Sequence, residues 1–262
     1  PTVLVTGESR ALAIEGFGLE AADRILVSAE GCEETATKGV AVDAVVEFPA
    51  AGNFSLCYYY ATVGAVAVEE LVVRDITYQG PTAFVNGVAE HVEVLGLTSM
   101  DVVRFVKGAD CTRNVLAETS YAEAGVEVVL RASYPVVSVC YMVYPRYDFY
   151  RDTVAIKAMG VDFISSSAWL TSVTTLADTF LLDPTFVAVG DVVKFVSEAA
   201  TVSTTVTSVA TDGAAIAPVV FTETGMYHVE VTFGAVSKTF VSAFEVEIVE
   251  GDVSSYGFKS VY

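Results

Sequence analysis

The chain has 262 residues, of which 53% are hydrophobic and 18% charged, and its 33 acidic and 14 basic residues give a net charge of -19. This acidity disfavours binding to nucleic acid or to an anionic membrane, which need cationic side chains, and the apolar content excludes a disordered acidic protein. No apolar run reaches the roughly 20 residues of a membrane helix, and the mean hydropathy of +0.54 indicates apolar surface that is buried against another protein.

An internal repeat is the clearest pattern in the chain. Residues 1–7 (PTVLVTG) return as residues 81–87 (PTAFVNG), with the proline, threonine, second valine and glycine unchanged. A leucine four residues before an aspartate, a cysteine, and a Ser-x-Cys-Tyr segment then follow in the same order in both copies. These landmarks are residues 19–23, Cys32 and 55–58 in the first copy, and 97–101, Cys111 and 138–141 in the second. Their shared order indicates tandem domains.

A third copy is more divergent. Residues 191–196 (DVVKFV) repeat residues 101–106 (DVVRFV) with one change, and residues 225–230 keep the hydrophobic pattern of residues 52–57 but end in Glu230 instead of a cysteine. We therefore predict β-sandwich repeats at residues 1–79, 80–163 and 164–250, with a disulfide in the first two only, followed by a tail at 251–262.

Within the repeats, apolar and polar residues alternate with a period of two. Examples are residues 126–130, 227–231 and 244–248. Together with abundant Val and Thr and closely spaced Gly, Pro, Asp and Asn, this alternation is typical of strands and turns. Only residues 64–74 are ambiguous between helix and strand. Units of about 80 to 90 residues with many short strands have the size of an immunoglobulin-like sandwich, so we predict an all-β fold of tandem immunoglobulin-like repeats.

The four cysteines lie at equivalent places in the first two repeats. Of the three possible pairings, this symmetry favours Cys32 with Cys57 and Cys111 with Cys140. Each bond would stabilise its repeat by about 3 kcal/mol. Zinc is disfavoured because the cysteines belong to separate repeats and lack Cys-x-x-Cys spacing. Since disulfides persist in oxidising compartments, we expect a secreted or surface-exposed protein.

Other residues raise open alternatives. Asn53 begins the sequon Asn-Phe-Ser, which would carry a glycan in an extracellular eukaryotic protein or would otherwise be a polar turn residue. Tyrosines gather in residues 58–60 and 141–150, and Tyr144, Tyr147 and Tyr150 are candidates to bind a sugar or a protein partner, with strand packing as the alternative.

Metal binding and catalysis find little support. Asp23, Asp101 and Asp191 recur at equivalent positions and suggest either calcium between repeats or turns that precede strands. The turn is favoured because none lies in an Asp-x-Asp-x-Asp cluster, so we expect no cofactor, with calcium as the minor alternative. His91 and His228 belong to different repeats, and no nucleophile-elbow, zinc-protease or P-loop motif occurs, so we expect no enzyme.

The pattern of Leu-x-x-x-Asp before a valine strand, then Cys, then Gly-x-Phe-x-Leu-Cys-Tyr resembles immunoglobulin-like repeats of large extracellular surface or filament proteins, of the protist and algal type. The resemblance covers residues 16–60 and 96–141. It implies extracellular architecture and no catalytic residues. The organisation is also similar to that of extracellular filament subunits, which polymerise by passing a terminal strand between neighbours.

Terminal strands offer a physical route to such a polymer. An open sandwich edge leaves N–H and C=O groups that an extended segment of a neighbour can satisfy. The candidate side chains at the two ends are Pro1, Val3, Val5, Tyr256, Phe258 and Val261. We therefore expect a structural subunit of an extracellular filament or appendage, a homo-oligomer that grows head to tail as a linear or helical polymer. The alternatives are a carbohydrate- or protein-binding adhesin module and, for the tail, a linker or disordered end.

Overall fold

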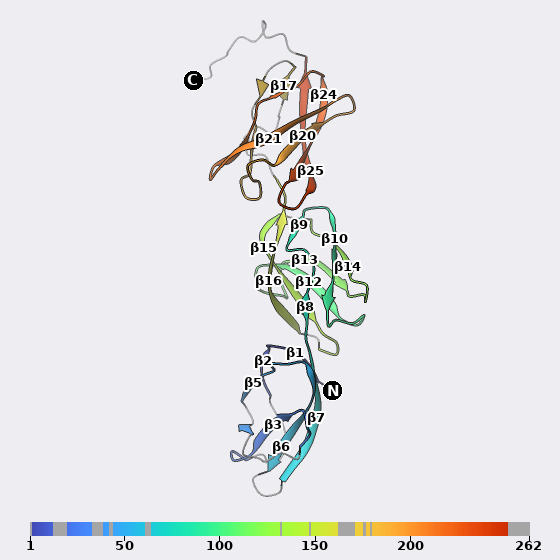
Figure 1. The fold of residues 1–262 in the computed structure, drawn as a ribbon, viewed down its shortest axis with the longest axis vertical. Coiled ribbons are helices and arrows are strands. Elements are labelled where there is room, and N and C mark those ends of the chain that lie inside the picture. The colour runs from blue at the N-terminus through green and yellow to red at the C-terminus, as the bar shows by residue number, and fades with distance from the viewer. Residues whose placement is uncertain are drawn as a thin grey trace. The chain divides into compact units, whose positions relative to one another are not determined.

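The computed structural model describes residues 2–12, 20–32, 39–41, 44–60, 64–131, 133–146, 148–161, 171–174, 177–178 and 180–250. All regular secondary structure in these residues is β-strand, and three large sheets follow one another along the chain (Figure 1). The predicted all-β fold is confirmed, and the three large sheets agree with tandem β-sandwich repeats. In the part of the chain that is described, no helix is long and apolar enough to cross a lipid bilayer.

The chain divides into two compact units. The first holds Pro1–Gly80, His91–Val128 and Ser138–Val154, and the second holds Pro81–Glu90, Val129–Val137 and Ala155–Tyr262. Both units therefore contain residues of the predicted second repeat, and the repeat boundaries stay a prediction from the sequence. Residues 1–79, 80–163 and 164–250 are named the first, second and third repeat below.

The first repeat is built on a sheet with the strand order β1-β7-β6-β3-β4, and β2 pairs with β5. Its strands are β1 (Thr2–Val5), β2 (Ser9–Ala11), β3 (Arg24–Ser28), β4 (Val40–Ala41), β5 (Val45–Glu47), β6 (Gly52–Tyr60), β7 (Gly64–Arg74) and β8 (Thr77–Tyr78). The ambiguous residues 64–74 thus form a strand. Alternate side chains, among them Leu4, Ile25 and Phe48, fill the core, and β1 runs parallel to the end of β7.

The second repeat has the sheet order β13-β12-β15-β16-β9, with β10 paired to β14 and β11 paired to β8. The strands are β9 (Ala83–Val85), β10 (Ala89–Val92), β11 (Val94–Leu95), β12 (Val102–Lys107), β13 (Val115–Ser120), β14 (Val126–Val129), β15 (Tyr134–Met142) and β16 (Phe149–Met159). As in the first repeat, the first strand, β9, lies parallel to the end of the last strand, β16. This shared pairing is the structural counterpart of the sequence repeat.

The third repeat has the longest sheet, in the order β17-β25-β24-β20-β21-β22-β19, and β18 pairs with β23. Its strands are β17 (Thr171–Val173), β18 (Ala177–Asp178), β19 (Leu181–Leu182), β20 (Val192–Val196), β21 (Thr201–Ala210), β22 (Gly213–Ile216), β23 (Val219–Val220), β24 (Gly225–Phe233) and β25 (Lys238–Val249). Again the first strand, β17, is parallel to the last, β25. The third copy, which is the most divergent in sequence, therefore keeps the parallel pairing seen in the other two.

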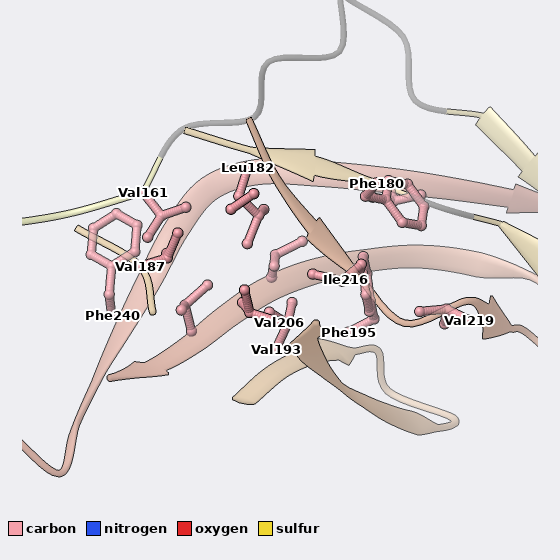
Figure 2. Packing of buried hydrophobic residues seen from close by; sticks show 14 of the residues in the cluster. Val161, Phe180, Leu182, Val187, Val193, Phe195, Val206, Ile216, Val219 and Phe240 are labelled. Carbon is pink, nitrogen blue, oxygen red and sulfur yellow. The ribbon is translucent and has the colours of Figure 1, made fainter. Parts of the chain in front are cut away.

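Aromatic rings form the centre of the third core. The ring of Phe195 lies 5.0 Å from that of Phe180 and 5.3 Å from that of Phe221, between centroids. Figure 2 shows Phe195 and Phe180 pointing inward together with Val193, Val206 and other aliphatic side chains. The same buried cluster includes Val85, Met159 and Val161, at the ends of second-repeat strands. Within the second compact unit, the hydrophobic core is thus continuous from the second repeat into the third.

Two disulfides join the predicted partners. Cys32 is bonded to Cys57 and Cys111 to Cys140, across 25 and 29 residues. In the third repeat Glu230 takes the place of the strand cysteine, and its partner across the sheet is Lys194. The carboxylate of Glu230 lies 3.4 Å from Nε2 of His228 on the same strand.

Candidate interaction surfaces and repeat junctions

Three equivalent aspartates close equivalent turns. In each repeat the carboxylate accepts a hydrogen bond from the backbone N–H three residues earlier, and all three residues are buried. The donors and distances are Glu20 to Asp23 at 2.7 Å, Thr98 to Asp101 at 2.6 Å, and Ala188 to Asp191 at 2.7 Å. The structure therefore gives these residues the turn role. Among the described residues, no group of three or more His, Cys, Asp or Glu side chains is arranged to hold a metal ion.

In the second and third repeats, the other carboxylate oxygen of the aspartate ties a further loop to the turn. Asp101 Oδ1 accepts the backbone N–H of Tyr144 at 2.7 Å, and Asp191 Oδ1 accepts that of Gly234 at 2.9 Å. Each donor lies just after the end of a strand: Tyr144 follows β15, and Gly234 follows β24. A single buried carboxylate thus fixes two loops in each of these repeats, because each of its oxygens is satisfied by backbone.

The first repeat uses a tyrosine at this place. The hydroxyl of Tyr58 donates a short hydrogen bond to Asp23 Oδ2. Burial of the ring, followed by this bond to a carboxylate, raises the pKa of Tyr58 to about 12. The neutral phenol is the form that donates to Asp23, so the pair is held together as long as Tyr58 keeps its proton.

The turn of the second repeat is also a junction with the first. Arg74, the last residue of β7, places Nη1 2.9 Å from Asp101 Oδ2. The hydroxyl of Thr98 donates to the same oxygen at 3.0 Å. Asp101 is fully buried. Both residues belong to the first compact unit, and the ion pair links the end of one repeat to the turn that opens the next.

A second ion cluster lies in the same unit. Arg146, between β15 and β16, forms two hydrogen bonds to Glu8 at 2.6 and 3.0 Å and two to Asp148 at 2.8 and 2.6 Å. Its side chain is only 9% exposed. Burial opposes the charge, but the hydrogen bonds that the guanidinium donates to both carboxylates outweigh it and raise the pKa of Arg146. In return, the guanidinium lowers the pKa of Asp148.

The second compact unit contains a comparable contact. Lys238, the first residue of β25, forms a short ion pair with Glu90 of β10, and Glu90 is buried. In both cases a cation at the hairpin turn of one repeat meets a carboxylate near the first strands of the preceding repeat. No sequence motif predicts these two contacts. The available signal was a basic residue in or next to that turn in both the second and the third repeat, in a chain with only 14 basic residues.

The predicted tyrosine site is only partly assembled. Tyr144 is exposed, with 41% of its surface accessible. Tyr150 is half-buried and stacks on Tyr141, with ring centroids 6.4 Å apart, while the Tyr141 hydroxyl donates to Asp152 at 2.6 Å. Tyr147 lies outside the described residues. The packing alternative therefore accounts for Tyr150, and Tyr144 is the described candidate that presents an open ring.

The remaining predicted sites lie apart from one another. Asn53 is exposed at the start of β6. Val3 and Val5 are buried in β1, on the opposite face of the strand from Leu4, which packs in the core of the repeat. Pro1, Tyr256, Phe258 and Val261 lie outside the described residues. Val3 and Val5 are therefore already covered, whereas glycosylation and assembly stay predictions.

Comparisons with known proteins give structural likenesses only. No family model matches the chain, and no curated protein matches it. One similar solved structure is the Bacteroides ovatus mixed-linkage glucan utilization protein SGBP-B, with 8% sequence identity and a TM-score of 0.24, over 95% of this chain and 66% of that chain. Another is an ICAM-5 ectodomain fragment, with 12% sequence identity and a TM-score of 0.26, over 95% of this chain and 75% of that chain. A third is the BSP domain of a biofilm-associated protein, with 13% sequence identity and a TM-score of 0.25, over 67% of this chain and 30% of that chain. The chain thus spans 66% and 30% of the glucan-utilization and biofilm structures, and no function follows from likenesses of this size.

Proposed function

We propose that the chain is a structural subunit of an extracellular filament or surface appendage, which assembles head to tail with other copies. The observation that carries the proposal is the construction of the repeat junctions. Arg146 and Arg74 bind carboxylates across one junction, and the third core continues into the second repeat at the other. Side-chain contacts that hold consecutive repeats together suit a structural protein built from tandem domains. The two disulfides fit an oxidising, extracellular compartment.

Electron microscopy of negatively stained protein tests this proposal. The purified full chain is compared with a chain that ends at residue 250, which keeps every described strand because β25 ends at Val249. Filaments from the full chain that disappear after truncation support a subunit joined through its tail. Separate particles from both proteins, at every concentration tried, contradict a filament subunit.

A second candidate function is a carbohydrate- or protein-binding adhesin module. The observation that favours it is the exposed ring of Tyr144, beside the junction formed by Arg146. An exposed tyrosine supplies a large apolar face with a polar tip, which suits a sugar or a protein surface. Replacing Tyr144 by Ala should then abolish binding on a glycan array while filament length stays unchanged. Loss of filaments without any loss of glycan binding would speak against the adhesin.

We also propose that Asn53 carries an N-linked glycan if the source is a eukaryote. Asn53 is exposed on β6, and its sequon partner Ser55 lies in the same strand. The mass of the intact native protein before and after treatment with a peptide N-glycosidase measures this. An unchanged mass would assign Asn53 to the unmodified alternative.

A further inference from the structure

One sheet edge of the first repeat is open. Strand β7 pairs with β6 along most of its length, from Gly64 opposite Tyr60 to Val73 opposite Gly52. On its other side β1 pairs only with residues 71–74. Among the described strands, residues 65–70 therefore pair through their backbone on one side only, and on the other side the hydroxyl of Thr2 donates a hydrogen bond to the Glu69 carboxylate at 2.7 Å. These six residues are named the β7 edge.

The β7 edge contains neither lysine nor proline, although its pairing with β6 shifts register between Leu56 and Cys57. Natural edges are blunted by lysine, proline or inward-pointing charge because unpaired N–H and C=O groups recruit other strands. The first part of the β7 edge reads Ala-Val-Ala-Val, and Val66 and Val68 are 52% and 49% exposed. The corresponding stretch of β16 contains Arg151 and Asp152 instead. On the β7 edge, the charges come only at its end, with the exposed Glu69 and Glu70.

We propose that the β7 edge binds residues 253–262 of a second copy as an added β-strand. The inference rests on the proposed function and names the surface that would receive the tail. The segment reads VSSYGFKSVY, without proline or acid, and Tyr256, Phe258 and Tyr262 fall on one face of an extended strand. Lys259 supplies a cation for Glu69 and Glu70, and opposite charges on paired strands stabilise the pairing.

The other end of the chain is a poorer occupant. Val3 and Val5 are already buried, and β1 already pairs with residues 71–74 of β7. Releasing β1 would expose these side chains to water at a cost in hydrophobic burial. The tail follows the last strand of the third repeat, β25, which ends at Val249. Donation of the tail therefore leaves every described strand pairing intact.

A binding experiment with a synthetic tail tests the inference. A fluorescent peptide of residues 251–262 is titrated with the full chain, and its anisotropy is measured. We expect saturable binding that the double change Val66→Lys and Val68→Lys weakens at least about tenfold, because lysine on an edge strand blocks further pairing. The matched control, Val136→Lys with Val189→Lys, adds the same charge at side chains that are 52% and 66% exposed. It should change the affinity less than about twofold, because neither residue lies on the β7 edge.

A second peptide keeps the test independent of how the variant chain folds. Changing Tyr256 and Phe258 of the peptide to serine should also weaken binding to the unaltered chain, and hydrogen exchange of the β7 edge should slow only with the original peptide. Absent binding, or binding that survives both pairs of changes, overturns the inference. Filaments of the full chain without peptide binding would overturn it while keeping the proposed function. Peptide binding at the β7 edge without filaments would support the binding of the tail and contradict the proposed filament subunit.

Discussion

Tyr58 makes the first repeat sensitive to alkaline pH. Because its pKa is raised from 10.0 to about 12 in the folded chain, the folded state holds the phenolic proton more tightly than the unfolded state does. The resulting stabilisation is complete below pH 10 and is lost as the pH rises through about 12. Tyr58→Phe should therefore flatten the fall in melting temperature over this range, with exposed Tyr144→Phe as the control. An unchanged alkaline profile in Tyr58→Phe would contradict the bond to Asp23.

The equivalent aspartates should differ in their contribution to stability. Asp101 is fully buried and receives Arg74 in addition to backbone N–H groups, whereas no cation of the described residues pairs with Asp191. We expect Asp101→Asn to destabilise by about 2 to 4 kcal/mol, since it leaves Arg74 without its charged partner. Asp191→Asn should cost about 1 to 2 kcal/mol. Scanning calorimetry of both variants measures the difference, and equal losses would show that Arg74 adds nothing.

At the scale of elements, the disulfides should stabilise two repeats and leave the third unaffected. Replacing both Cys111 and Cys140 by Ala removes a crosslink over 29 residues, which should lower the stability of the second repeat by about 3 kcal/mol. Hydrogen exchange resolves the repeats separately, so β12 and β15 should exchange faster while β20 and β24 keep their rates. Faster exchange in β20 and β24 as well would mean that the repeats unfold as one.

The strands and the cysteine pairs were accessible from sequence because they follow local rules. Period-two alternation predicts strands, and symmetry between the copies singled out Cys32 with Cys57. The junctions were not accessible in the same way. Arg146 contacts Glu8 across 138 residues, and no local spacing predicts that a turn of one repeat reaches the start of another. The contact of Lys238 with Glu90 spans 148 residues and could not be predicted for the same reason.

For the whole molecule, Arg146 should decide how firmly the first repeat is joined to the second. Arg146→Ala removes four hydrogen bonds to Glu8 and Asp148. We expect the free energy of unfolding to fall by about 2 kcal/mol, less than for a fully buried pair, because water reaches the partly exposed Asp148. The segment between β7 and β9 should then be cut faster in limited proteolysis. Arg113→Ala breaks an exposed pair with Asp110 and should cost less than about 0.5 kcal/mol. Equal cutting rates in both variants would contradict this role of Arg146.

The pairing of first and last strands has a mechanical consequence. In every repeat the first strand lies parallel to the last strand of the repeat's large sheet, as β1 does to β7, β9 to β16 and β17 to β25. Since both strands run in the same direction, the chain enters the pair at one end and leaves it at the other. Tension along the chain then slides the two strands past each other and strains all of their hydrogen bonds at once, instead of opening them singly. Each repeat therefore resists stretching until the whole pair shears.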